Sequence, residues 1–86
     1  MWSTFKDLIE NLTSVINQKS NLSATKFRLI NYKTQYLKDS YVYFCKIKGE
    51  GINKFIHVKI DQGIDGVFEL MDVKLNESRY SEIKVF

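Results

Sequence analysis

The sequence predicts an α+β fold in which one N-terminal helix packs on an antiparallel sheet of four or five strands. Apolar residues recur at three- and four-residue steps near the N-terminus, and from Lys26 onward the pattern changes to alternation. Short clusters of glycine and polar residues separate the alternating segments, which is typical of strands joined by tight turns. The chain has 86 residues, 44% of them hydrophobic and 27% charged, and this size and composition predict a single globular domain over residues 1–86.

A single apolar stripe predicts the helix. Its members recur with the helical period: Phe5, Leu8, Ile9, Leu12, Val15 and Ile16. Ser3 or Thr4 is suited to the N-cap position, and Asp7 would then lie near the positive end of the helix. The polar stretch 18–21 predicts the end of the helix.

Four later segments favour strands, and a fifth follows near the C-terminus. They are residues 28–36, 41–47, 55–60, 67–73 and 81–86. In the first segment, Ile30, Tyr32, Thr34 and Tyr36 are expected to share one face. In the third, Ile56, Val58 and Ile60 are expected to face inward, and His57 and Lys59 outward.

The order of the elements predicts which turns lie together. In an antiparallel meander the first and third hairpin turns lie at the same end of the sheet. The turns at 35–40 and 61–66 should therefore converge, together with the N-terminus at Met1 and Trp2, while the turn at 49–51 lies at the opposite end. Loops held on a rigid scaffold often carry function, so this end is the predicted recognition rim.

Several segments match one family in the same order. Residues 27–35 resemble the strand that leads into a Q-x-V-x-G hairpin, and residues 43–47 resemble the strand that leaves it. Residues 55–60 are similar to the next strand, and residues 70–76 with 82–86 resemble the C-terminal part, including the final aromatic. On these segments the chain resembles a cystatin of the single-domain, disulfide-free stefin type, which implies a cystatin-like fold.

The resemblance implies an inhibitor of papain-like cysteine proteases that plugs the active-site cleft with a wedge of two hairpin loops and the N-terminal segment. Such a wedge binds through apolar burial on a preformed rim and needs no catalytic group, metal or cofactor. The implied protease-binding residues are Trp2 from the N-terminus, Gln35, Tyr36, Leu37, Lys38 and Asp39 from the first loop, and Gln62, Gly63 and Ile64 from the second. A monomer or a dimer that swaps the first hairpin is also implied.

The chain departs from the stefin pattern within the wedge. Asp39 stands where the motif has glycine, and Lys38 and Asp39 would bring charge toward a water-excluding cleft. The second loop lacks the family's proline and histidine, and only Met1 and Trp2 precede the predicted helix. These departures favour the alternative that the chain is a non-inhibitory module that binds another protein through the same rim.

Trp2 and the first hairpin carry the exposed aromatic candidates for an interface. Trp2 is either an interface anchor or a hydrophobic staple that packs on the first helical turns. Tyr36 and Leu37 are the stronger candidates, because the core does not need a large apolar pair at a turn.

Cys45 and His57 are the only residues of their types, and we expect neither catalysis nor metal binding from them. Alternation places His57 opposite Ile56 and Val58, and no third orienting residue is evident. We therefore expect a buried structural thiol and an exposed histidine. A single cysteine fits a reducing compartment, and no segment is typical of a signal peptide or a membrane span, so the expected location is the cytoplasm.

The lysines form the remaining candidate surface. Five of them could share the outer sheet face beside Phe55: Lys33, Lys46, Lys48, Lys59 and Lys74. Such a face could follow a phosphate backbone, with the aromatic ring stacking on a base. Glu69 and Asp72 dilute the patch and the net charge is only +3, so a solvated face is favoured over a nucleic-acid site.

Overall fold

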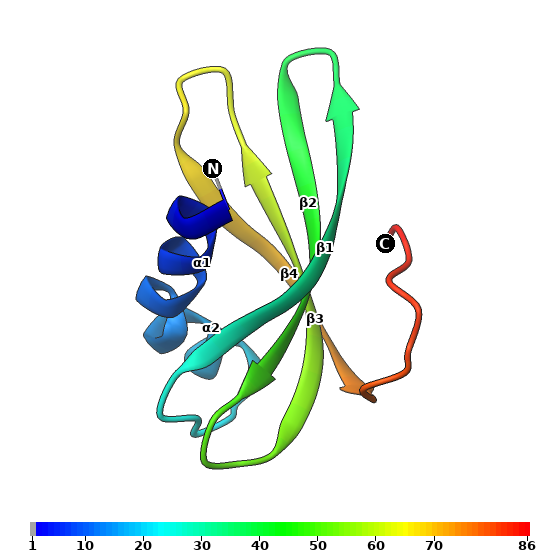
Figure 1. The fold of residues 1–86 in the computed structure, drawn as a ribbon. Coiled ribbons are helices and arrows are strands. Elements are labelled where there is room, and N and C mark those ends of the chain that lie inside the picture. Colours follow the sequence, from blue (N-terminus) through cyan, green and yellow to red (C-terminus); the bar gives the residue numbers. More distant parts are fainter. Residues whose placement is uncertain (1) are drawn as a thin grey trace.

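The computed structural model describes residues 2–86, with side chains described for residues 6–75 and 77–86. Its elements are α1 (Trp2–Asn11), α2 (Thr13–Ser20), β1 (Phe27–Leu37), β2 (Ser40–Gly49), β3 (Lys54–Gln62) and β4 (Phe68–Glu77). The strands form one antiparallel sheet in the order β1-β2-β3-β4. Both helices lie on one face of this sheet, and the chain after β4 lies on the other (Figure 1). The predicted α+β class is confirmed. Within residues 2–86 we find no helix with the length and apolar character that crossing a membrane requires.

The N-terminal helix is interrupted once, at Leu12. Its φ and ψ of −88° and 4° separate α1 from α2, although its N–H still donates to the Leu8 carbonyl at 3.0 Å. The predicted caps Ser3 and Thr4 are wrong, because α1 begins at Trp2 and both residues lie inside the helix. The end of the helix agrees with the prediction, since α2 stops at Ser20 and Asn21 adopts the left-handed conformation with φ of 59°.

The apolar stripe is correct for most of its length. Ile9 and Ile16 are fully buried against the sheet, and Leu8 and Leu12 pack at the edge of the same core. The prediction that Val15 belongs to the buried stripe is wrong, because Val15 is 45% exposed. The buried residues of α2 are Ile16 and Ser20, which are four positions apart and therefore lie on one line along the helix. Beyond Leu12 only this line faces the sheet, and Val15 lies outside it. The Phe5 side chain lies outside the described side chains.

The helix-facing side of the sheet follows the predicted alternation in β3 but not in β1. Ile56, Val58 and Ile60 are all buried in the core, as expected. In β1 a bulge shifts the register between Leu29 and Asn31, and Ile30 is 44% exposed. The prediction for Ile30 is wrong because a bulge adds one unpaired residue, which breaks the two-residue period.

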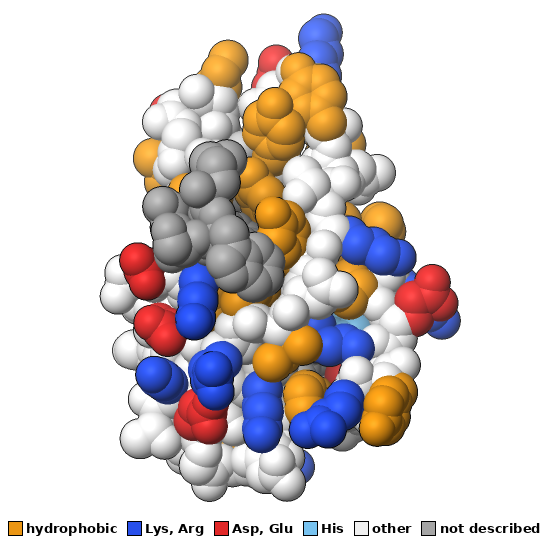
Figure 2. Space-filling view, in the orientation of Figure 1, with side chains coloured by type: hydrophobic (Ala, Val, Ile, Leu, Met, Phe, Trp, Pro, Cys, Tyr) orange, Lys and Arg blue, Asp and Glu red, His pale blue; other side chains and the backbone are white. Residues whose placement is uncertain are grey.

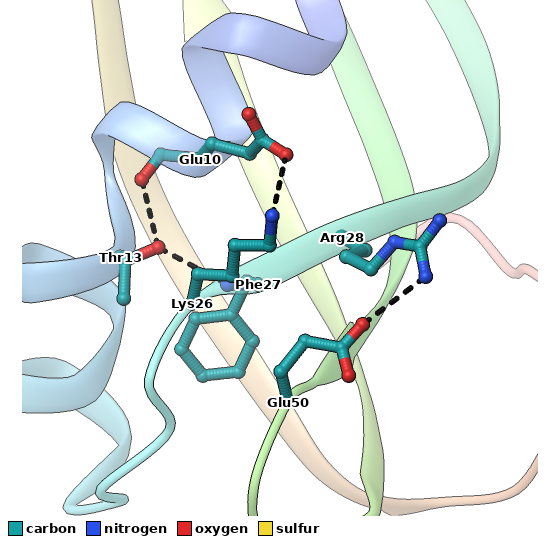
Figure 3. Close-up of polar contacts among 6 residues, drawn as sticks. All are labelled: Glu10, Thr13, Lys26, Phe27, Arg28 and Glu50. Carbon is teal, nitrogen blue, oxygen red and sulfur yellow. Dashed lines mark hydrogen bonds and ion pairs between the residues drawn. The ribbon is translucent and has the colours of Figure 1, made fainter.

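A threonine hydroxyl connects the helices to the first strand (Figure 3). The Thr13 hydroxyl donates to the Glu10 carbonyl at 2.7 Å and accepts from the Phe27 N–H at 3.1 Å. Glu10 also forms an exposed ion pair with Lys26, at 3.6 Å. These contacts fix where β1 starts relative to the helix and so help to position the hairpin that follows.

The turn between β2 and β3 is tied to the chain just before β1. The Glu50 carbonyl accepts from the Thr25 N–H at 2.9 Å and from the Thr25 hydroxyl at 2.9 Å, and the Glu50 N–H donates to the Lys26 carbonyl at 2.8 Å. The Glu50 carboxylate pairs with Arg28 at 3.2 Å (Figure 3). These contacts of Glu50 with Thr25, Lys26 and Arg28, called the clamp below, hold the turn at the end of the sheet opposite the predicted rim.

Residues 78–86, called the C-terminal segment below, cover the outer face of the sheet instead of forming the predicted fifth strand. A turn in which the Ser81 N–H donates to the Ser78 carbonyl follows β4. The segment then lies over the outer face, where Ile83 packs against Val42 and Phe44. Ile83 and Phe86 pack on this face, whereas Val85 is 64% exposed, so the apolar residues of the segment serve packing on a face and not pairing along an edge.

This cover changes the environment of the outer face. His57 is 1% exposed and Lys46 is 8% exposed, so the expectation of an exposed histidine on an open lysine surface is wrong. Lys59, also expected to face solvent, is half-buried. The predicted neighbourhood of Phe55 is correct, because the Lys48 ammonium lies 5.8 Å from the centre of its ring.

Candidate interaction site at the hairpin tips

The first and third hairpin tips lie side by side at one end of the sheet, as the meander geometry predicts (Figure 1). The turn between β1 and β2 and the loop between β3 and β4 enclose a pocket of about 340 Å³. Its lining comes from both hairpins: Tyr36, Lys38, Asp39, Ser40, Tyr41, Gln62, Gly63, Ile64 and Gly66. The turn between β2 and β3 lies at the opposite end.

The first tip is a two-residue turn. Leu37 pairs with Ser40, which leaves only Lys38 and Asp39 between the strands. Among residues 2–86 the non-glycine residues with positive φ are Asn21 and Asn53, so Asp39 does not occupy the left-handed region. Aspartate at the position of the motif's glycine therefore imposes no backbone strain here.

An aromatic row runs from this tip toward the core. The Tyr36 and Tyr41 ring centres are 5.0 Å apart, Tyr41 and Tyr43 are 6.5 Å apart, and Tyr43 lies 6.1 Å from Tyr32 and 6.2 Å from Phe68. Tyr36 is 67% exposed and Tyr41 is 46% exposed, while Tyr43 packs on the core. Figure 2 shows hydrophobic side chains gathered on the surface between the two tips. Tyr43, which is anchored on the core, thus supports the more exposed rings of Tyr41 and Tyr36.

Tyr43 also joins the two hairpins. Its hydroxyl donates to the Gln62 side-chain carbonyl at 3.1 Å. Burial raises the pKa of Tyr43 above its ordinary value, and the nearby Tyr32, Tyr41 and Cys45 act in the same direction. The hydroxyl therefore stays protonated and remains a donor at neutral pH.

Internal hydrogen bonds shape the second loop. The Gly63 N–H donates to the Val67 carbonyl at 3.1 Å, and the Gly66 N–H donates to the Gly63 carbonyl at 2.9 Å. The Asp65 carboxylate accepts from the Val67 N–H at 3.0 Å. Ile64 is 88% exposed at the apex of this loop. The loop thus presents Ile64 at its apex, and Val67 at 62% exposure beside β4, on a backbone that is already ordered.

The structure brings most of the predicted site residues together. Six line the pocket, and the remaining two of the first hairpin, Gln35 and Leu37, are exposed on β1 beside it. Trp2 lies at the start of α1, but its side chain is outside the described side chains. Ser40, Tyr41 and Gly66 also line the pocket and were not predicted as site residues from the sequence. Folding the first hairpin about a two-residue turn would have found Tyr41, because it pairs with Tyr36.

Cys45 and His57 lie on opposite faces of the sheet. Cys45 belongs to the core beneath the helices, whereas His57 lies under the C-terminal segment. Burial raises the pKa of the Cys45 thiol well above its usual range. The two residues therefore do not form a nucleophile–base pair.

Two curated proteins match the chain along nearly its whole length. Cystatin-A of Rattus norvegicus is 23% identical over 83 residues, which cover 94% of this chain and 79% of that protein. Cystatin-A2 of Dictyostelium discoideum is 26% identical over 83 residues, which cover 96% of this chain and 84% of that protein. No family model matches the chain, and no solved structure matches it. The matches confirm the resemblance to stefin-type cystatins and agree with the helix-on-sheet architecture.

Proposed function

We propose that this chain, which resembles stefin-type cystatins over nearly its whole length, inhibits papain-like cysteine proteases by occluding the active-site cleft. In this proposal the wedge consists of the first hairpin (Gln35, Tyr36, Leu37, Lys38 and Asp39) and the second loop (Gln62, Gly63 and Ile64). Trp2 supplies the N-terminal contact. The inhibitor presents ordered turns to the partner's cysteine and histidine without placing a scissile peptide bond between them.

The juxtaposition of the two exposed tips carries this proposal. Tyr36 and Ile64, at 67% and 88% exposure, are large apolar side chains that the core does not use. They stand on hairpins whose turns are already formed, so binding would cost little ordering entropy. A narrow end with apolar side chains on both tips fits insertion into a cleft.

The charges of the first tip favour an alternative to protease inhibition. Lys38 and Asp39 are both exposed at the apex. Burying an unpaired charge in a water-excluding cleft is costly, so these charges favour a partner with a polar rim or with complementary charges. The alternative is therefore a non-inhibitory module that binds another protein through the same rim.

A titration separates the two functions. The chain is added to a papain-like protease, and residual hydrolysis of a small fluorogenic peptide is measured. We expect inhibition at micromolar chain concentration or below, which corresponds to a binding free energy of about −8 kcal/mol or stronger. Full residual hydrolysis at that concentration would remove the inhibitor proposal and leave the binding module.

A matched pair of variants locates the binding surface. Leu37→Asp places a charge at the first tip, where Leu37 is 44% exposed, and we expect at least about a tenfold loss of inhibition. Leu75→Asp makes the same change at a residue of similar exposure, 41%, near the turn between β2 and β3. This control should inhibit like the unmodified chain. Equal inhibition by both variants would show that the rim is not the binding surface.

We further propose that the chain acts in the cytoplasm. Its single cysteine is unpaired and buried, which fits a reducing compartment.

A further inference from the structure

Three basic side chains lie in one row across the outer face of the sheet. The register pairs Lys46 of β2 with His57 of β3, and His57 with Lys74 of β4. Residues directly opposite each other on neighbouring strands have close side chains, and like charges in such positions destabilise the pairing. A neutral His57 therefore separates two ammonium groups.

His57 is buried with incomplete hydrogen bonding. It is 1% exposed, and its Nδ1 lies 3.6 Å from a carboxylate oxygen of Glu77. Its Nε2 is also buried and has no hydrogen-bond partner among the residues that the structure describes. A pocket of about 280 Å³ adjoins the ring beneath the C-terminal segment. The charged groups around His57 are Lys46 from β2, Lys74 and Glu77 from β4, and Glu82 and Lys84 from the C-terminal segment.

The two lysines of this row also hold the C-terminal segment. The Lys46 ammonium donates to the Arg79 carbonyl at 2.9 Å. The Lys74 ammonium lies 5.8 Å from the centre of the Phe86 ring, and that ring packs 5.6 Å from the ring of Phe44. A new positive charge between the lysines would therefore act directly on two attachments of the segment.

We propose that His57 is a pH-sensitive latch beneath the C-terminal segment. Protonation completes a row of three positive charges, and Glu77 is the carboxylate paired with its central ring. Glu82, which also lines the adjoining pocket, already pairs with Lys33 at 3.9 Å. The segment then detaches from the outer face and uncovers the apolar surface of Val42 and Phe44. This latch is independent of the proposed protease inhibition, because it lies on the sheet face and not at the hairpin tips.

The direction of the pH dependence follows from the surroundings of the ring. Burial lowers the pKa of His57; Glu77 opposes this shift, and Lys46 and Lys74 add to it. Once the segment is released, His57 should titrate near its ordinary pKa of about 6.5. Attachment is therefore strongest above that pH. Below it, each pH unit favours release by up to about tenfold, until the pH reaches the lowered pKa of the attached state.

The test is an NMR titration of the full chain from about pH 7.5 to about pH 5, which spans the ordinary histidine pKa. We expect the Ile83 methyl and Phe86 ring signals to move toward unstructured values as the pH falls, while the core signals of Ile9 and Val58 stay in place. In His57→Gln, which stays neutral, the segment signals should not change with pH. The same pH response in both proteins would overturn the latch. Simultaneous movement of core and segment signals would also overturn it, because it would indicate global unfolding.

A second variant covers the case in which His57→Gln does not fold. Glu77→Gln removes the carboxylate that pairs with His57 at 3.6 Å. We expect it to release the segment to a greater extent than the unmodified chain at about pH 5, because the charged row then loses the carboxylate paired with its central ring. Equal or smaller release in Glu77→Gln would contradict the proposed electrostatic origin.

Discussion

Two neighbouring residues of α2 show how burial decides the importance of a side chain. Ile16 is fully buried in the helix–sheet core, whereas Val15 is 45% exposed. We predict that Ile16→Ala lowers the free energy of unfolding by about 2–5 kcal/mol, because it leaves a cavity in the core. Val15→Ala should change it by no more than about 0.5 kcal/mol. Urea unfolding followed by circular dichroism measures both, and similar losses would place Val15 in the core after all.

The single thiol provides a second test at the residue scale. Cys45 is buried and its pKa is raised by burial, so both access and thiolate formation are suppressed. We predict that a disulfide reagent at mildly alkaline pH labels the folded chain at least about a thousandfold more slowly than the chain in guanidinium, because labelling requires opening of the structure. Comparable labelling rates would show that the core beneath the helices is open.

Two glycine turns at opposite ends of the sheet differ in what surrounds them. Gly51 has φ of +88° and Gly66 has φ of +82°, so alanine is strained at either position. A Cβ on Gly51 would lie 2.8 Å from the Thr25 hydroxyl, while a Cβ on Gly66 would meet nothing within 4 Å. The turn at Gly51 is thus confined by the clamp, whereas the turn at Gly66 is open to solvent.

The difference predicts an order of stabilities. Gly66→Ala should lose about 1–2 kcal/mol from backbone strain alone. Gly51→Ala should lose about 0.5–1.5 kcal/mol more, because Thr25 must move away from the Glu50 carbonyl. Chemical unfolding of the two variants measures this difference. Equal stabilities would mean that the bond between Thr25 and Glu50 contributes little.

At the element scale, the features predictable from sequence are those set by local pattern. The strand at Ile56, Val58 and Ile60 and the end of the helix near Asn21 depend on alternation and on turn chemistry within a few residues. The exposure of Ile30 was not predictable, because alternation assumes a ladder without a bulge. The burial of His57 depends on a segment more than 20 residues downstream.

In the candidate site, too, local sequence pattern predicts some features and only the folded structure supplies the others. Tyr36 and Ile64 were predictable as tip residues, since turn clusters and meander order are visible in the sequence. The aromatic row and the contribution of Tyr41 require the cross-strand register, which only the folded hairpin supplies. Asp39 stands where the motif has glycine, and the sequence alone does not show that the two-residue turn avoids positive φ at this position.

At the scale of the whole molecule, the first hairpin predicts an alternative assembly. β1 and β2 are 11 and 10 residues long and are joined by the two residues Lys38 and Asp39. If this turn opens, the same strand contacts can form between two chains, and we propose that a swapped dimer forms after partial unfolding and refolding.

Light scattering after incubation near the unfolding midpoint measures this assembly. We expect a species of twice the monomer mass. A variant with two glycines inserted between Lys38 and Asp39 should form less of it, because a longer loop makes closure of the hairpin within one chain easier than exchange between two chains. A dimer fraction that does not respond to loop length would argue against exchange of this hairpin.

The clamp at Glu50 has a practical consequence. Thr25 donates hydrogen bonds to the Glu50 carbonyl, and the Lys26 carbonyl accepts one from the Glu50 N–H, so the turn between β2 and β3 is held in place. Strand alignment is therefore set far from the rim residues. The apex positions 38–39 and 64–65 are therefore suitable for randomisation in a display library, with the remainder of the chain kept as a constant framework. A chain of this length without a disulfide would then serve as a starting point for engineered affinity reagents that fold inside cells.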